Sequence, residues 1–139
     1  MIQKLFSPTS WSANATNLAS LILRLTFGLL MLSHGIPKLI NLTNGTMEFG
    51  DPIGIGVPAS LALTVFAEVL CSVLIIIGLW TRLALIPLII TMAVAVFIVH
   101  INHGLETMEL ALMYLLSYCA LFLLGSGRFS VDAILKRKV

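Results

Sequence analysis

Charged residues are scarce in this sequence. They make up 10% of its 139 residues, whereas ordinary soluble domains contain about 25%. A soluble domain of this size leaves about a third of its extended-chain surface in water, and fourteen charged residues are too few to cover such a surface. Hydrophobic residues make up 59% of the chain, which excludes a disordered chain. We therefore expect an integral membrane protein.

The scarcity of cysteine and the absence of cofactor-binding motifs exclude several classes of redox protein. Only two cysteines are present, so a disulfide scaffold and a Cys-x-x-Cys redox pair are excluded, and there is no haem-attachment motif. No glycine-rich dinucleotide motif is present either. The net charge of +2 is too small to suggest nucleic acid as a partner. Any redox cofactor is therefore expected to be a lipid-soluble quinone or to sit on a partner protein.

Four continuous apolar stretches are long enough to cross a bilayer as helices. A helix needs about 20 mostly apolar residues to span roughly 30 Å of hydrocarbon, and continuous apolar runs favour helices over strands. The stretches cover residues 18–36, 59–79, 83–101 and 108–124. We predict an all-α membrane four-helix bundle, formed by one domain over residues 1–139. The long outer loop, residues 37–58, is expected to fold back over the mouth of the bundle.

The distribution of basic residues predicts the orientation. Four spans place both termini on one side, and that side carries Lys4, Arg82, Arg128, Lys136, Arg137 and Lys138. The opposite loops carry only Lys38. By the positive-inside rule, the N- and C-termini are predicted to be cytoplasmic.

Two ionised residues, Arg24 and Glu68, lie deep inside the predicted spans. A charge at the bilayer centre costs about 2.5–3.5 kcal/mol even on a lenient scale. From the helical rise, the two residues differ by about 7 Å in depth, so we predict that Arg24 pairs with Glu68. Two interpretations stay open: a structural pin between helices, or a pair that binds substrate or protons.

The face of the first span that carries Arg24 predicts a ligand pocket. Gly28 and Gly35 lie on this face at helical spacing and let a neighbouring helix or a flat ligand come close. The predicted ligand-binding residues are Gly28, Met31, Gly35, Lys38, Cys71, Glu109 and Tyr114.

A second polar set gathers at the outer ends of the spans. It contains His34, Lys38, His100, His103, Glu106 and Glu109. Proton handling, a polar ligand head and interfacial hydrogen bonding are all consistent with this set. A metal site is a weaker alternative, with His34, His100, His103 and Glu109 as its ligands. Because there is no compact metal motif, we predict no metal.

The ordered motifs resemble the DoxX family of small four-span membrane proteins. The resemblance rests on Leu23-Arg24-Leu25, Gly28, His34-Gly35, Lys38-Leu39, Phe49, Gly56-Val57-Pro58, Glu68-Val69-Leu70, Ile77-Gly78-Leu79, Thr81-Arg82, His100, Gly104, Glu109-Leu110-Ala111 and the segment Gly125 to Asp132. It implies a four-helix bundle in a bacterial inner (plasma) membrane and a loose association with quinone- or thiol-linked redox chemistry. In the terminal segment, Arg128 and Asp132 are expected to form an i, i+4 pair that caps the inner helix end.

Three functions follow as hypotheses. The first is a membrane oxidoreductase subunit that binds a quinone, in which Arg24 or His34 would hydrogen-bond a carbonyl oxygen and Glu68 or His100 would exchange a proton. The second is a non-enzymatic scaffold in the lipid bilayer that recruits a soluble or membrane redox partner. The third is permeation of a small solute by a homo-oligomer.

Overall fold

The structure is a computed structural model that describes residues 12–137. The predictions on Lys4 and Lys138 lie outside the described residues. The helical elements are α2 (Ala13–Asn44), α3 (Val57–Val65), η1 (Phe66–Cys71), α4 (Ser72–Ile77), α5 (Thr81–Val94), η2 (Ala95–Val99), α6 (Leu105–Leu124) and α7 (Val131–Lys136). Residues 12–137 contain no strand. Four continuous helices, Ala13–Asn44, Val57–Ile77, Thr81–Val99 and Leu105–Leu124, are long and apolar enough to cross a membrane. The predicted all-α membrane fold is thus confirmed, and the cytoplasmic placement of the termini stays a prediction.

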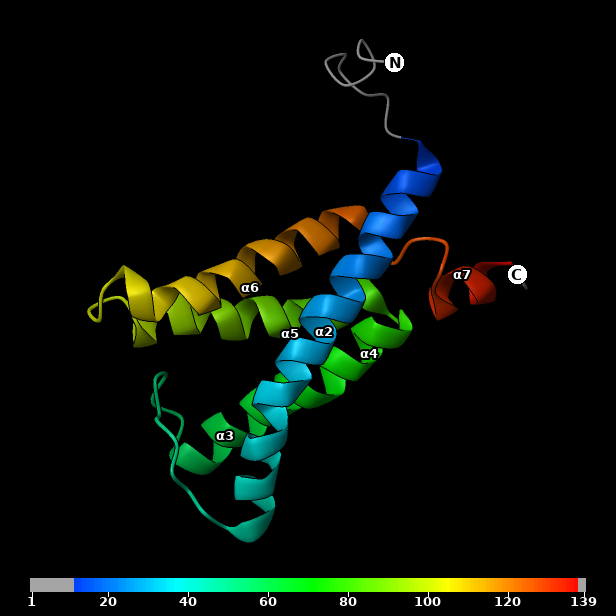
Figure 1. Cartoon of the computed structure of the whole chain (residues 1–139). Helices are drawn as coiled ribbons and strands as arrows, with labels where there is room; N and C mark the ends of the chain where they lie inside the picture. The colour runs from blue at the N-terminus through cyan, green and yellow to red at the C-terminus, as the bar shows by residue number, and fades with distance from the viewer. Residues whose placement is uncertain (1–11, 138–139) are drawn as a thin grey trace.

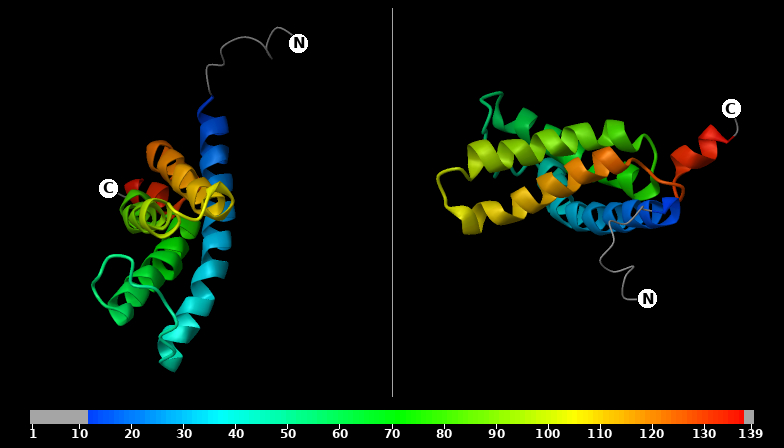
Figure 2. Two further views of the ribbon diagram at one scale, coloured as in Figure 1. Left: turned by 90° about the vertical axis from the view of Figure 1, so that its left-hand side faces the viewer. Right: turned by 90° about the horizontal axis from the view of Figure 1, so that it is seen from above.

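The four helices pack with α5 and α6 side by side and α2 crossing them (Figure 1, Figure 2). Near its start, α2 contacts the link that joins α6 to α7, because Ser20 donates to the Gly125 carbonyl. The link that joins α4 to α5 lies at the same end, because the Asp132 N–H of α7 donates to the Gly78 carbonyl. We call this the terminal end. The opposite end, formed by loop 45–56 and the link 100–104, is the loop end.

The first helix is longer than predicted. It was expected to end at Ile36, but it continues through Pro37 to Asn44 and ends at Gly45, whose φ of 72° is left-handed. Pro37 removes one backbone N–H, and hence one helical hydrogen bond, yet membrane helices tolerate proline. The connection predicted over residues 37–58 is therefore the shorter loop 45–56.

Two of the spanning helices contain π-helical segments. In η1, the six residues Phe66–Cys71 include Glu68, and η2 ends at His100 as its C-cap. A π-helical segment widens the helix locally and is frequently found at functional sites. The two segments therefore mark the level of the bundle where a ligand site is expected.

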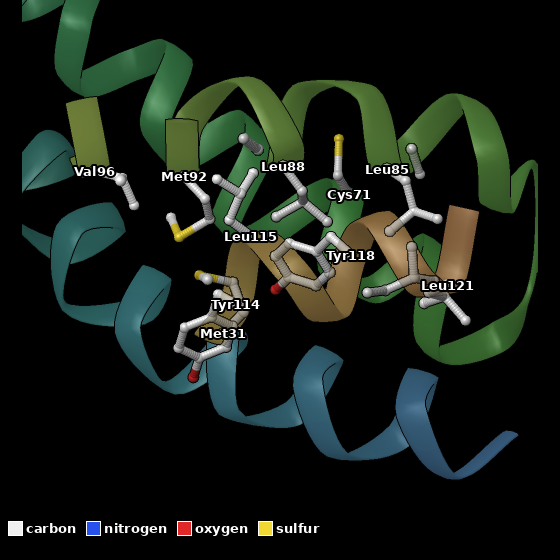
Figure 3. Packing of buried hydrophobic residues seen from close by; sticks show 13 residues of the cluster. Met31, Cys71, Leu85, Leu88, Met92, Val96, Tyr114, Leu115, Tyr118 and Leu121 are labelled. Carbon is white, nitrogen blue, oxygen red and sulfur yellow. The ribbon is translucent and has the colours of Figure 1, made fainter. Parts of the chain in front are cut away.

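A cluster of buried side chains fills the centre of the bundle (Figure 3). Tyr118 is fully buried in it, and its hydroxyl donates to the Phe27 carbonyl at 3.3 Å. Cys71 belongs to the same cluster, whereas Cys119 is exposed on α6, and both thiols are free. The outer faces carry many exposed leucines and isoleucines, as expected for helices that face lipid.

Candidate functional site

Glu68 is paired with Lys38 near the middle of the second spanning helix. The Lys38 Nζ donates to both carboxylate oxygens of Glu68, at 2.6 and 2.7 Å. The Glu68 side chain is 3% exposed and the Lys38 side chain 31% exposed. The carboxylate is therefore enclosed, whereas the ammonium group lies on the open side of the pair.

The predicted pairing of Arg24 with Glu68 is wrong. Arg24 is 1% exposed, and its guanidinium donates Nη1 to the Ser126 carbonyl and Nη2 to the Phe129 carbonyl, the latter at 2.7 Å. The error came from ending the first span at Ile36, which left Lys38 in a loop. Because α2 continues through Pro37, Lys38 lies on the helix itself and reaches Glu68.

Two cavities flank the Lys38–Glu68 pair. One has a volume of about 250 Å³ and opens between α2 and α6, and the other has about 270 Å³ and lies on the side of α3 and α5. Both are lined by Lys38, Glu68 and His100, and by Met92 and Ala95. The ion pair thus lies between two small cavities of the bundle and lines both of them.

Aromatic and imidazole rings surround the cavity on the α2–α6 side. The Tyr114 ring lies edge-on to the rings of Phe27 and His34, with centroid distances of 5.6 and 6.0 Å. The His100 ring is 6.1 Å from the His103 ring. The cavity therefore has flat, partly apolar walls and titratable groups toward the loop end.

Gly35 brings α2 against the backbone of η1. A Cβ atom at this position would lie 2.9 Å from the carbonyl carbon of Glu68 and 2.8 Å from a methyl group of Val69. Real Cβ atoms do not come so close to backbone, so only glycine permits this approach. The contact holds Glu68 at the depth where Lys38, one turn further along α2, meets it.

Gly35→Ala is expected to destabilise the bundle by about 1–3 kcal/mol, the usual cost of overpacking. The added methyl group pushes α2 away from η1 and lengthens the Lys38–Glu68 contact. Unfolding in mixed detergent micelles measures the loss. Gly50→Ala is the matched control, because a Cβ there meets nothing within 4 Å. Equal stability of the two variants would contradict the proposed close packing.

Loop 45–56 folds back over the cavity on the α3–α5 side, as predicted. Phe49, Pro52 and Ile53 line that cavity together with Glu68, and the Lys38 Nζ lies 5.9 Å from the centre of the Phe49 ring. The loop is thus a cover for one of the two cavities.

Asp51 holds this cover in place. Its carboxylate accepts from Ser60 Oγ at 2.7 Å, Gly56 N at 2.8 Å and Ile55 N at 3.1 Å. The hydrogen bond from Ser60, followed by those from the backbone, lowers the pKa of Asp51 below its usual value. Hydrogen bonds to the ionised form favour that form.

The cover is expected to loosen in acid. Because the folded pKa of Asp51 is depressed, the stabilisation is present above the ordinary carboxyl pKa of about 3.9 and is lost as the pH falls through the lower folded value. Asp51→Asn should speed hydrogen exchange of residues 45–56 at neutral pH and change it little once Asp51 is protonated. Glu48→Gln is the control, because Glu48 is exposed in the same loop. A pH-independent effect of Asp51→Asn would contradict this role.

The structure brings together about half of the predicted site residues. Those that line the cavity on the α2–α6 side are Met31, His34, Lys38, Glu68, His100 and Tyr114. Cys71 lies in the buried cluster instead, and Glu109 is exposed on α6. Gly28 packs against Ile75 and Ile76. Within residues 12–137, no three histidine, cysteine or carboxylate side chains gather closely enough to hold a metal ion, so the alternative set of ligands does not assemble.

Arg24 belongs to a hydrogen-bonded hub at the terminal end. The segment 125–130 offers carbonyl oxygens to Arg24 and to Ser20, and Asn17 accepts from the Arg128 N–H at 2.9 Å. A Cβ on Gly78, whose φ is 75°, would lie 2.6 Å from an Arg24 nitrogen. This hub connects α2 to the links that join α4 to α5 and α6 to α7, and we call it the structural pin because it fixes these elements relative to one another.

Asp132 caps the start of α5. It accepts from Trp80 N at 2.8 Å, and from Thr81 N and Thr81 Oγ1 at 3.2 Å each. Asp132 thus caps a helix end, as predicted, but it does so without Arg128. Arg128 and Asp132 form no ion pair, since Lys38–Glu68 is the one found within residues 12–137.

Several residues on which the resemblance rests, among them Arg24, Glu68 and Asp132, form the contacts described above, and a family model matches the chain. The DoxX model matches residues 19–101, which include Arg24, Lys38 and Glu68. The chain belongs to the DoxX family. The terminal hub 125–132 lies beyond the matched residues, yet its binding partner Arg24 lies within them.

Two relatives extend the comparison over most of the chain. A protein of Haemophilus influenzae described as uncharacterized is 30% identical over 79% of this chain and 85% of its own length. An uncharacterized membrane protein of Mycobacterium tuberculosis is 31% identical over 84% of this chain and 80% of its own length. No solved structure matches the chain. One of the two relatives of this DoxX protein is thus described as a membrane protein.

Proposed function

We propose that this DoxX protein is a redox subunit of the bacterial inner membrane that binds a lipid-soluble quinone beside the Lys38–Glu68 pair and supplies protons to it. The observation that carries the proposal is an ion pair with a buried carboxylate, at mid-span and between two cavities. Ionisable groups inside membrane spans are costly and mark binding or proton pathways by default.

The composition of the cavities suits a flat ring with polar oxygens. Met31, Met92 and Leu110 offer apolar walls on the α2–α6 side, and the Tyr114 ring lies among them. Lys38 provides N–H donors for a carbonyl oxygen. Its partial exposure of 31% allows the ammonium group to turn from Glu68 toward a ligand without leaving the site.

The titratable residues suit proton supply. Reduction of a quinone to its quinol consumes two electrons and two protons. In the proposed reaction, the electrons come from a partner electron-transfer protein. Each proton enters at the loop end, passes through His100 or His34, and is given to a quinone oxygen by Glu68 or Lys38. Both histidines line the α2–α6 cavity with the pair, which supports this route.

Quinone binding to the purified protein tests the proposal. Decylubiquinone and menadione, in oxidised and reduced forms, are expected to raise the thermal stability of the wild type in detergent. A ligand at 100 times its Kd adds about 2.7 kcal/mol. Glu68→Gln should abolish this gain. Glu109→Gln is the matched control, because Glu109 is an exposed carboxylate on α6 and lines neither cavity.

The outcomes distinguish a quinone-binding role of the Lys38–Glu68 pair from a purely structural one. A gain in the wild type and in Glu109→Gln, but not in folded Glu68→Gln, supports quinone binding at the pair. No gain with either redox form, or an equal gain in all three proteins, would overturn the proposal.

A further inference from the structure

A larger cavity lies at the terminal end, away from Glu68. It has a volume of about 710 Å³ and lies between the start of α5, the segment 124–127 and α7. Figure 1 shows α7 projecting from this end of the bundle. Two basic residues, Arg82 and Lys136, line the cavity from opposite elements.

Arg82 has N–H groups available for an anion. Its side chain is exposed, and the guanidinium carbon lies 6.0 Å from the centre of the Phe122 ring. It forms no ion pair with any carboxylate within residues 12–137. Arginine binds phosphate oxygens well because its planar group presents paired donors.

The carboxylate of Asp132 also lines this cavity, but its oxygens are already used. They accept from the Trp80 and Thr81 N–H groups and from the Thr81 hydroxyl. The start of α5 is therefore already capped by Asp132 and is not an anion site. An anion in the cavity would be held by Arg82 and Lys136 instead.

An apolar groove of about 380 Å³ leads away from the same place. Trp80 and Leu83 line both the cavity and the groove. The groove lies between two helices: Phe66, Leu70 and Leu74 line one side, and Leu83, Ile86 and Pro87 line the other. Pro87 is six residues into α5, so the groove extends about 9 Å along the helix.

The exposed Trp80 indicates the depth in the membrane at which the cavity meets the groove. Its side chain is 63% exposed, and tryptophan in membrane proteins is enriched at the level of the lipid headgroups. A basic cavity at headgroup level suits a lipid phosphate group, and the apolar groove that continues from it suits an acyl chain.

We propose that this end of the protein binds one anionic phospholipid. The phosphodiester is held by Arg82 and Lys136, and one acyl chain lies in the groove between the second and third helices. A free phosphate would use the basic cavity alone, whereas a lipid uses both parts. The predicted orientation places the site in the cytoplasmic leaflet, where anionic lipids attract basic residues.

Rebinding of lipid to the delipidated full-length protein tests the site. Phosphatidylglycerol and phosphatidylcholine with identical chains are titrated, and bound lipid is counted by native mass spectrometry. The double variant Arg82→Ala/Lys136→Ala should weaken phosphatidylglycerol binding about 25-fold, on the scale of two basic residues at an anionic membrane surface. Arg128→Ala is the control, because Arg128 is exposed at the same end and does not line the cavity.

A second variant tests the chain-binding part. Leu83 is 64% exposed at the junction, so Leu83→Trp narrows the entrance to the groove without disturbing the core, and it should also weaken phosphatidylglycerol binding. Equal binding of phosphatidylcholine, unchanged binding by the double variant or by Leu83→Trp, or stabilisation by inorganic phosphate equal to that by the lipid would each overturn the proposal.

Discussion

Arg24→Met is expected to lower the free energy of unfolding by about 3–6 kcal/mol, because it removes two charge-assisted hydrogen bonds worth about 1.5–3 kcal/mol each. The carbonyl groups of Ser126 and Phe129 lose their donor at the junction of α2 with the terminal segment. Methionine keeps most of the side-chain volume, so the loss reports on hydrogen bonding. Unfolding by sodium dodecyl sulfate in mixed micelles measures it.

Arg82→Met is the matched control for this change. Arg82 is exposed and contacts the Phe122 ring at 6.0 Å, an interaction worth about 0.5–1 kcal/mol at an exposed site. If Arg24→Met cost no more than Arg82→Met, the terminal hub would not be the structural pin described above.

The Lys38–Glu68 pair should respond asymmetrically to the loss of either partner. Lys38→Met leaves a carboxylate that is 3% exposed without its cation, which is expected to cost about 3–5 kcal/mol. Glu68→Met leaves a lysine that is 31% exposed and can turn toward the surface, so we expect a loss of only about 1–2 kcal/mol. The free energy of unfolding of each variant gives the comparison.

The double variant Lys38→Met/Glu68→Met completes the cycle. Replacing a buried ion pair by apolar groups of similar volume is often neutral, so its stability should return to within about 1 kcal/mol of the wild type. Quinone binding should be absent even so. A stable double variant that still binds quinone would show that the pair is only structural, and a double variant as unstable as the sum of the single variants would contradict the coupling.

The spans could be read from the sequence because length and apolar content are local properties. The second, third and fourth spans, predicted at 59–79, 83–101 and 108–124, agree with the helices Val57–Ile77, Thr81–Val99 and Leu105–Leu124 to within about three residues. The first span was predicted too short at Pro37, because proline usually ends a helix in water. In α2 the helix continues past it.

The binding partners of Arg24 and Glu68 could not be predicted from local sequence properties. Depth alone made Arg24 and Glu68 compatible, because one-dimensional spacing does not report how helices cross. Gly35 carried a usable signal, since it lies one helical turn before Lys38 and on the same face, and its close contact with Glu68 brings Lys38 within reach. The hydrophobic pattern of the sequence did not predict the π-helical segments at Glu68 and before His100.

By itself, the sequence determined that the chain lies in a membrane, that it has four spanning helices and that Arg24 and Glu68 lie deep within them, because the cost of placing charge and open backbone in hydrocarbon leaves few alternatives. Only the tertiary structure decided that Arg24 binds the carbonyl groups of the terminal segment and that Lys38 neutralises Glu68. The reason is that these choices depend on a crossing of helices fixed by contacts at single glycines, and on a segment more than 100 residues from Arg24 in the chain.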